Sequence, residues 1–270
     1  MVVQHNLQAA NTNRMLGQNV KAVAKSTEKL SSGYQVNRAA DDAAGLSISE
    51  KMRNQIRGIN QAVKNSEDGV SLIQTAEGNM NEIHSILQRM GELATKAAND
   101  VNATDDRKAI DDEMNQLTEE IDSIAKKAAF NGTYLLRGSF TNKQLQVGAV
   151  AGENMSITIS SMKASKIGVA DLKVSSHAKA ASSMTKISEA IKKVSTARSK
   201  LGAIQNRLNY TINNLENYSE NLTSAESQIR DTDMATEMTN YTKNNILQQA
   251  AQSMLAQSNQ STQGVLSLLQ

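Results

Sequence analysis

The sequence contains no cysteine, no proline and no tryptophan among its 270 residues, and aromatic side chains make up only 3% of it. The lack of cysteine excludes disulfides, cysteine-ligated zinc and thiol catalysis. The lack of proline and the scarcity of aromatics argue against a core built on aromatic anchors and against stacked sheets with proline-rich turns. Alanine, serine, asparagine, glutamine, leucine, isoleucine and methionine dominate instead. This composition favours long helices.

Clusters of charge and long apolar runs are also missing. The 29 Lys and Arg residues nearly balance the 27 Asp and Glu residues, and no basic block provides an electrostatic footprint for nucleic acid. The N-terminal segment lacks the basic start and continuous apolar run of a cleaved secretory signal. No segment offers the roughly 20 mostly apolar residues of a membrane span. We therefore expect a protein that binds no nucleic acid, does not insert into a membrane, and is soluble or exported without signal cleavage.

The last stretch of the chain, residues 244–270, contains no Asp, Glu, Lys or Arg. Its apolar residues recur at a helical spacing, and its remaining positions are mostly Gln, Asn, Ser and Thr. Because an unpaired charge is costly to remove from water, amides and hydroxyls suit a helix that has neighbours on several sides. One N-terminal helix covers only part of such a surface, so we expect other copies of the chain to cover the rest. Repeated head-to-tail contact that does not close produces a helical filament.

Helical periodicity dominates the rest of the sequence. Two of the patterns run far longer than an ordinary globular helix, which is typical of a coiled-coil-like rod. Gly33 follows the first pattern, and glycine is the usual residue just past a helix. The patterns extend from Ala9 to Leu30, Ile48 to Ala97, Ile110 to Ile124, Ile187 to Ile229, and Ile246 to Leu268.

The period changes between the third and fourth helical patterns. Asn131-Gly132 is a turn signal, and the segments KQLQVG and MSITIS alternate apolar and polar residues on either side of AVAGEN. This pattern predicts a β-hairpin near residues 140–160. Because the helices are nearly mirror-symmetric about it, the two long helices should fold back on each other and the terminal helices should lie side by side.

The predicted fold is mainly α. It is a long antiparallel helical rod, a coiled-coil-like bundle, with a small β-hairpin region and paired terminal helices. The predicted domains are a terminal helical domain, residues 1–42 plus 231–270, and a rod domain, residues 43–230, that carries the hairpin.

We expect the apolar residues of the two terminal helices to form the packing core of a filament. The first helix also carries Lys21, Lys25, Glu28 and Lys29 late in its length, which suits a layer next to solvent or a lumen. The candidate filament-core residues are Leu16, Val20, Val23, Leu30, Ile246, Leu247, Met254, Leu255, Val265, Leu268 and Leu269.

Five segments carry a resemblance to a known family. They are LSSGYQVNRAADDAAGLSIS, LQRMGELATKAAND, FNGTYLL, SKLGAIQNRLNYTINNLENYSENLTSAESQIRDTDMATE, and the final segment from ILQQAAQSMLAQSNQ to VLSLL. Together they resemble bacterial flagellin, the subunit of the flagellar filament, over roughly residues 1–140 and 185–270. The resemblance implies an inner domain made of both chain ends and a surrounding rod domain with a hairpin. Because so few residues separate the two halves, it implies a minimal form without variable outer domains.

The resemblance also implies what the protein does. It implies a structural protein with no enzymatic activity, no cofactor and no metal, which polymerises with itself into the filament used for swimming. It implies secretion of the unfolded chain through the flagellar export apparatus with the help of a chaperone, and assembly at the filament tip. Cap and junction proteins would be further partners, and the extracellular filament would be its location. A chain without disulfides or prolyl bonds suits rapid folding after export.

In some flagellins an arginine and a leucine on the long rod helix, with a glutamate on the next helix, contact the host Toll-like receptor 5. The matching residues here are Arg89, Leu93 and Glu113, while Gly91 stands where a basic residue is common. The resemblance therefore implies a candidate receptor epitope. The same residues suit contacts between neighbouring subunits, and burial in a filament would confine the epitope to free subunits.

The remaining titratable residues fit structural roles better than catalysis. Asp41 and Asp42 point about 100° apart on a helix, which makes a poor pair for one cation, so we expect them to cap a helix. The acidic residues between 111 and 120 have no nucleophile or pocket-forming neighbour in the sequence. Arg198 interrupts an apolar seam, and we expect it to snorkel or to pair with a carboxylate of the rod helices.

Two alternatives to a filament subunit stay open on the sequence. A hook-filament junction protein shares flagellin-like ends and would assemble only a short ring. A secreted helical interaction module would form a defined small oligomer, and its terminal helices would be formed in the monomer. Filament growth from seeds and light scattering distinguish these three cases.

Overall fold

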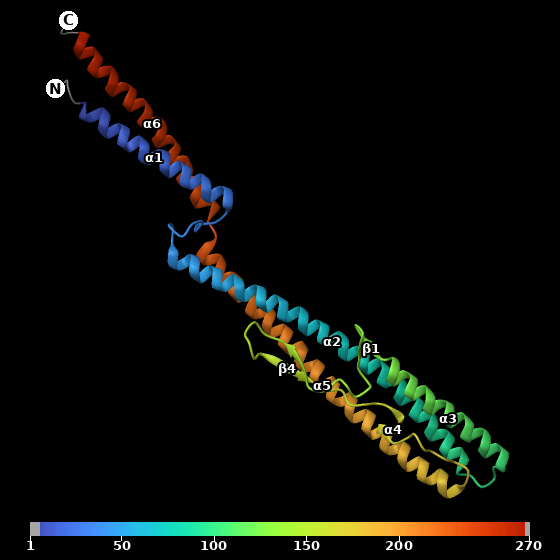
Figure 1. Ribbon diagram of the computed structural model, residues 1–270. Helices are drawn as coiled ribbons and strands as arrows, with labels where there is room; N and C mark the ends of the chain where they lie inside the picture. Colours follow the sequence, from blue (N-terminus) through green and yellow to red (C-terminus); the bar gives the residue numbers. More distant parts are fainter. Residues whose placement is uncertain (1–5, 268–270) are drawn as a thin grey trace. The chain divides into compact units, whose positions relative to one another are not determined.

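The computed structural model of the protein describes the backbone of residues 6–267 and the side chains of residues 6–261 (Figure 1). The chain divides into two compact units. Unit 1 contains residues 1–54 and 220–270, and unit 2 contains residues 55–219. The helices α2 (Ala43–Ala97) and α5 (His177–Arg230) each contribute residues to both units.

The core of unit 2 follows the periodicity of its two longest helices. The buried residues of α2 recur at alternating steps of three and four, the spacing that keeps one stripe of a helix against a partner. The predicted long helical patterns are therefore confirmed. The stripe on α2 consists of Ile73, Ala76, Met80, Ile83, Leu87, Met90, Ala94 and Ala97, and its counterpart on α5 includes Ala180, Ile187, Ala190, Val194, Leu201 and Leu208.

Within unit 2, α2 and α5 run antiparallel, as predicted. Ser219 Oγ lies 3.1 Å from Asn60 Oδ1, and farther along the pair Arg198 Nη2 lies 3.3 Å from Glu77 Oε1. Residue numbers thus fall on α5 as they rise on α2. The second contact also confirms that Arg198 forms an ion pair with a carboxylate of the facing helix.

The helix α3 (Thr104–Lys127) adds a third apolar stripe to the core, with Ile110, Met114 and Ile121 buried. After it, strand β1 (Ala129–Phe130) pairs with β2 (Thr133–Tyr134) across Asn131 and Gly132. Both turn residues have positive φ, 45° and 76°. This is the combination that a two-residue type I′ turn requires, so the predicted turn is confirmed.

The predicted β-hairpin near residues 140–160 is also confirmed. Strand β3 (Lys143–Gln146) pairs antiparallel with β4 (Asn154–Ile157). Met155 and Ile157 of β4 are buried in the core of unit 2, whereas the residues between and beside them are exposed. The alternation that predicted the strand is therefore the alternation between core and solvent.

The segment that follows the hairpin contains a short helix, α4 (Ala164–Ile167), which the sequence did not predict. Side chains of α3 fix this segment. Asp122 Oδ1 accepts a hydrogen bond from Ala164 N at 2.8 Å, and Asp111 Oδ1 accepts one from Val174 N at 3.2 Å. Asp111 and Asp122 thus hold the segment after the hairpin, a role that the sequence did not predict; Asp112, Glu119 and Glu120 are exposed, as expected for a solvated helix face.

The segment before α2 confirms the capping role for Asp42 and not for Asp41. Asp42 Oδ1 accepts hydrogen bonds from Ala44 N at 3.0 Å and Gly45 N at 2.9 Å, at the start of α2. Asp41 instead pairs with Lys25 at 2.9 Å. That ion pair lowers the pKa of Asp41 and raises the pKa of Lys25.

Candidate assembly surface on the terminal helices

The terminal helices α1 (Leu7–Ser32) and α6 (Met234–Ser267) pack side by side in unit 1 (Figure 1). They run antiparallel. Asn6 Nδ2 donates to the carbonyl of Ser258 at 3.3 Å at one end of the pair, and Lys29 Nζ lies 4.0 Å from Glu237 Oε2 at the other. The predicted pairing of the terminal helices is confirmed.

Backbone hydrogen bonds between the segment that follows α1 and the segment that precedes α6 fix where the α1–α6 pair begins. Gly33 adopts φ 75° and its N–H donates to the carbonyl of Lys29, which ends α1 in the left-handed conformation that favours glycine. Thr232 N then donates to the carbonyl of Gly33 at 2.9 Å, and Gln35 N donates to the carbonyl of Arg230 at 2.7 Å. The segment after α1 and the segment before α6 are therefore held together as a short two-stranded contact.

Asp233 starts α6. Its Oδ1 accepts hydrogen bonds from Ala235 N at 2.9 Å and Thr236 N at 3.2 Å, and its Oδ2 accepts one from the hydroxyl of Thr236 at 2.9 Å. These bonds, with the Thr236 hydroxyl as the largest cause, lower the pKa of Asp233. The carboxylate also faces the positive end of the helix dipole.

The side of α6 that is covered within unit 1 is mostly polar. Ser258 of α6 and Ser26 of α1 are the buried residues of the described part of the pair. Because this contact covers few large apolar side chains, it contributes little hydrophobic free energy. The covered positions of α6 follow a helical spacing: Glu237, Asn240, Tyr241, Asn244, Asn245, Gln248, Ala251, Leu255 and Ser258.

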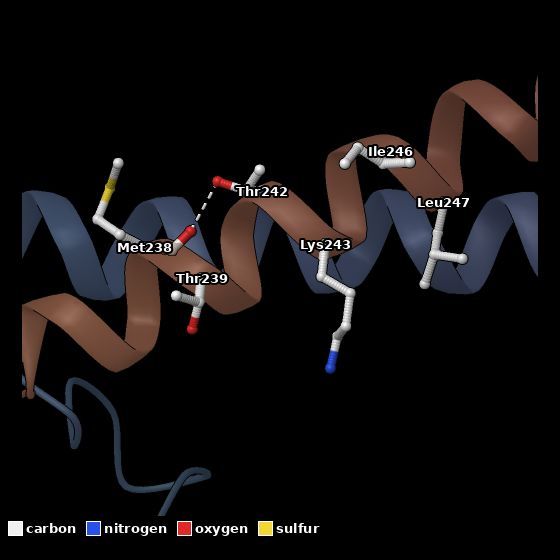
Figure 2. A pocket seen from close by; sticks show the side chains of 6 residues that line it. All are labelled: Met238, Thr239, Thr242, Lys243, Ile246 and Leu247. Atoms are coloured by element: carbon white, nitrogen blue, oxygen red, sulfur yellow. Dashed lines mark hydrogen bonds between the residues drawn. The ribbon is translucent and has the colours of Figure 1, made fainter.

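The large apolar side chains of α6 lie outside that contact. Met238, Ile246, Leu247 and Met254 are between 45% and 61% exposed. Figure 2 shows the first three beside Thr242, around a surface pocket of about 530 Å³ whose described lining comes from α6 alone. Thr239 and Lys243 also line this pocket, so its apolar side chains lie beside one charged group. Exposed apolar side chains gathered on one helix mark a contact site on a protein.

The predicted filament-core residues of α1 occupy two different positions. Leu16, Val23 and Leu30 are partly buried on the side that α6 covers, whereas Val20 is 44% exposed. The sequence pattern placed Val20 on the covered side of α1. In the structure the partly buried residue at this point is its neighbour Asn19.

On α6, Leu255 is partly buried and Ile246, Leu247 and Met254 are exposed. The side chain of Val265 and the residues Leu268 and Leu269 lie outside the described part of the structure. The structure thus separates the candidate residues into a set that joins α1 to α6 and a set that remains uncovered in one chain.

The three candidate epitope residues come together on α2 and α3. Arg89 Nη2 lies 2.9 Å from Glu113 Oε1, and Arg89 Nη1 lies 3.3 Å from Glu92 Oε2. The contact with Glu113, followed by that with Glu92, raises the pKa of Arg89. Leu93 is 3% exposed. It lines a surface pocket of about 510 Å³ together with Arg89, Glu92 and Glu113. The exposed part of the candidate epitope is therefore an ion pair.

The structure shows no site for metal chemistry over its described residues, where no three His, Asp or Glu side chains gather as ligands. None of the helices, as far as they are described, has a stretch apolar enough to cross a bilayer.

Comparison with known proteins assigns these features to a family. Residues 3–141 match the bacterial flagellin N-terminal helical region, and residues 184–269 match the bacterial flagellin C-terminal helical region. The chain is 52% identical over 271 residues to a flagellin of Halalkalibacterium halodurans and 48% identical over 303 residues to a flagellin of Bacillus subtilis. Each comparison covers 100% of both chains.

A solved structure agrees with this assignment. The crystal structure of Bacillus cereus flagellin is 32% identical, with a TM-score of 0.51, over 56% of this chain and 88% of that chain. Only the segment 142–183 lies between the two matched regions, so the chain has no large variable domain. The chain belongs to the bacterial flagellins, structural subunits of the flagellar filament that are not enzymes.

Proposed function

We propose that the uncovered apolar side chains of α6 are the surface through which copies of this flagellin pack in the filament core. In this arrangement the terminal domain, residues 1–42 plus 231–270, lines the core, and residues 43–230 form the shell around it. The filament-core candidates of α1 and α6 then have two roles. Those that are covered within the chain hold α1 against α6, and those that are exposed contact other copies of the chain.

The observation that carries this proposal is the polarity of the α1–α6 contact. In a two-helix unit that was stable alone, the largest apolar side chains would face the partner helix. Here Ile246 and Met254 are 61% and 57% exposed, while Ser26 and Ser258 are buried. Contact with other copies would remove the exposed apolar area from water, and the amides and hydroxyls around it would tolerate that burial.

The test replaces two exposed residues, Ile246→Gln and Met254→Gln, in one variant. Burying an apolar side chain of this size is worth about 1.5–3 kcal/mol, so we expect the critical concentration for seeded filament growth to rise roughly tenfold or more. Sedimentation and electron microscopy of the seeded reaction measure it. The matched control is Ile246→Leu with Met254→Leu, which keeps the surface apolar and should grow filaments near the normal concentration.

An unchanged critical concentration in the glutamine variant would contradict the proposed surface. Filament growth also separates this function from the two alternatives, because a junction protein would stop at a short ring and an interaction module at a small oligomer. The full-length identity to flagellins supports the filament.

We further propose that the chain is secreted through the flagellar export apparatus with a chaperone and is added at the filament tip, next to cap and junction proteins. The extracellular filament would be its location. The lack of cysteine and proline supports this route, because neither disulfide formation nor prolyl isomerisation then delays folding after export.

Arg89, Leu93 and Glu113 are the proposed epitope for Toll-like receptor 5. Arg89 and Glu113 are exposed and paired, so a receptor could reach both charges on a free subunit. Leu93 is 3% exposed and would act by holding the helix surface beneath them.

A further inference from the structure

A basic pocket of about 390 Å³ lies against α4 and α5 in unit 2. Its lining is rich in ammonium and hydroxyl groups, and it contains no Asp, Glu or aromatic side chain among the described residues. Lys192, Lys193 and Lys200 lie within nine residues of α5, and Lys166 joins them from α4, so the pocket combines charges from two elements. The lining residues that matter here are Lys166, Lys192, Lys193, Lys200, Ser161 and Thr196.

The positive charge of this pocket is not neutralised within the described chain. None of the ion pairs formed by the described residues uses any of the four lysines. Lys193 Nζ donates to the carbonyl of Ile167 at 3.1 Å and so ties α4 to α5. The ammonium groups of Lys166, Lys192 and Lys200 therefore give this part of the surface an uncompensated positive charge, which favours binding of an anion.

A hydroxyl in the same pocket also lacks a partner. Ser161 Oγ is buried and forms no hydrogen bond with the described residues. A buried polar group without a hydrogen bond is costly, and native structures contain few of them. Because this oxygen has almost no accessible surface, Ser161 forms part of the wall of the pocket and is not a contact for a bound ligand.

The spacing of the lysines indicates an extended ligand. Lys192, Thr196 and Lys200 follow one another at four-residue steps on α5. Four residues of helix rise about 6 Å, so the two lysines lie roughly 12 Å apart along the helix axis. One compact oxyanion cannot meet both ammonium groups, whereas a linear chain with repeated negative charges can.

Part of the pocket lies outside the helical regions that flagellins share. Ser161, Lys166 and Ile167 lie in the segment 142–183, between the two matched regions, whereas Lys192 and Lys200 lie in the matched C-terminal region. The pocket therefore combines a helix of the shared region with a segment that the family models do not cover.

We propose that this pocket binds an acidic polysaccharide, whose sulfate or carboxylate groups meet Lys166, Lys192 and Lys200. The choice of a polysaccharide rests on the proposed extracellular filament, because acidic polysaccharides are the linear polyanions that such a filament meets. It also rests on the lining, since the described residues offer no aromatic ring on which a nucleic-acid base could stack.

The test uses the full-length protein and a fluorescein-labelled heparin hexasaccharide, with binding followed by fluorescence anisotropy. Removing three charges, Lys166→Gln, Lys192→Gln and Lys200→Gln, should weaken binding roughly tenfold or more, because each exposed charge contact contributes a few-fold. Ser161→Ala should leave binding within about twofold of the wild type, because the buried oxygen of Ser161 forms no hydrogen bond with the ligand. Added salt should weaken binding of the wild type as it screens the charges.

The matched control removes three exposed lysines elsewhere in unit 2: Lys64→Gln, Lys108→Gln and Lys143→Gln. This variant has the same net charge as the pocket variant and should bind within about twofold of the wild type. Circular dichroism of both variants shows whether the fold is kept.

Three results would overturn the inference: no saturable binding by the wild type, an equal loss in the control variant, or equal binding of a desulfated hexasaccharide. Tighter binding of tripolyphosphate or of single-stranded DNA would overturn the assignment to a polysaccharide. Filament growth is measured on the same samples. Normal wild-type filaments without hexasaccharide binding remove the pocket inference alone, and absent wild-type filaments remove the proposed function.

Discussion

At the level of single residues, the start of α6 depends on the ionised carboxylate of Asp233. It accepts hydrogen bonds from two backbone N–H groups and from the Thr236 hydroxyl, at a helix end whose first N–H groups have no partner within the helix ladder. These bonds hold the pKa of Asp233 below its usual range, with the Thr236 hydroxyl as the largest cause. The cap is therefore linked to pH.

We predict that filaments lose the contribution of Asp233 in acid. Because its pKa is lower in the folded state than in the unfolded state, the stabilisation is complete above the unfolded pKa and disappears as the pH falls through the folded pKa. Asp233→Asn keeps a capping oxygen that does not titrate, and Asp233→Ala removes the cap at every pH. The alanine variant should need a higher critical concentration already at neutral pH, whereas wild type and asparagine variant should diverge only in acid.

Seeded growth at neutral pH and at about pH 3, below the ordinary pKa of an aspartate, measures the three critical concentrations. The quantity to compare is the critical concentration of the wild type divided by that of the asparagine variant. The acid response of all other carboxylates is the same in both proteins and cancels in this ratio. A ratio that does not change with pH, or an alanine variant that behaves as wild type at neutral pH, would show that this carboxylate does not stabilise α6 in the filament.

Single residues also show what sequence patterns capture. The roles of Asp42 and Arg198 could be predicted because capping and seam positions are defined by local spacing. The burial of Ser26 and Ser258 could not, because a serine that packs against a neighbouring helix has the same local sequence context as a solvated one.

At the level of elements, the sequence predicts the helices better than the surfaces between them. The core stripe of α2 repeats at three and four residues for so long that its helix could be predicted almost to its ends. The short helix α4 has no such repeat and depends on tertiary hydrogen bonds, such as that from Ala164 N to Asp122. The sequence pattern missed Asn19 on the covered side of α1 and chose Val20 instead. Polar side chains make part of this contact, and a pattern of hydrophobic residues cannot identify them.

The stripe on α2 leads to a prediction that compares two isoleucines of the same helix. Ile83 is 0% exposed in the core of unit 2, and Ile48 is 46% exposed. We expect Ile83→Ala to lower the free energy of unfolding by about 2–5 kcal/mol, since it leaves a cavity among packed side chains. Ile48→Ala should change it by less than about 0.5 kcal/mol.

Urea unfolding of isolated subunits, followed by circular dichroism, measures both values, and equal m-values confirm that the same transition is compared. If both variants lost the same stability, the buried stripe of α2 would not be the main source of the stability of unit 2.

At the level of the whole molecule, the two units differ in how much apolar surface they bury. The core described for unit 2 takes side chains from three long helices and from the strands that follow α3. In unit 1, over the residues whose side chains are described, Val36 is the single buried apolar residue. Since buried apolar area supplies most of the favourable free energy of folding, unit 1 has little stability of its own.

We predict that assembly changes the amide protection of unit 1 and leaves that of unit 2 unchanged. Hydrogen exchange measures this protection. In dilute isolated subunits, amides of α1 and α6 should exchange on the order of a hundredfold or more faster than those of α2 between Ile73 and Ala97, because local opening costs little where few apolar contacts break. In filaments the amides of α1 and α6 should become protected, since neighbouring copies then cover Ile246 and Met254. The amides between Ile73 and Ala97 serve as the internal control and should be protected in both states. Strong and equal protection of α1 and α6 in both states would mean that the terminal helices are stable without neighbours, and that the uncovered apolar side chains have another purpose than assembly.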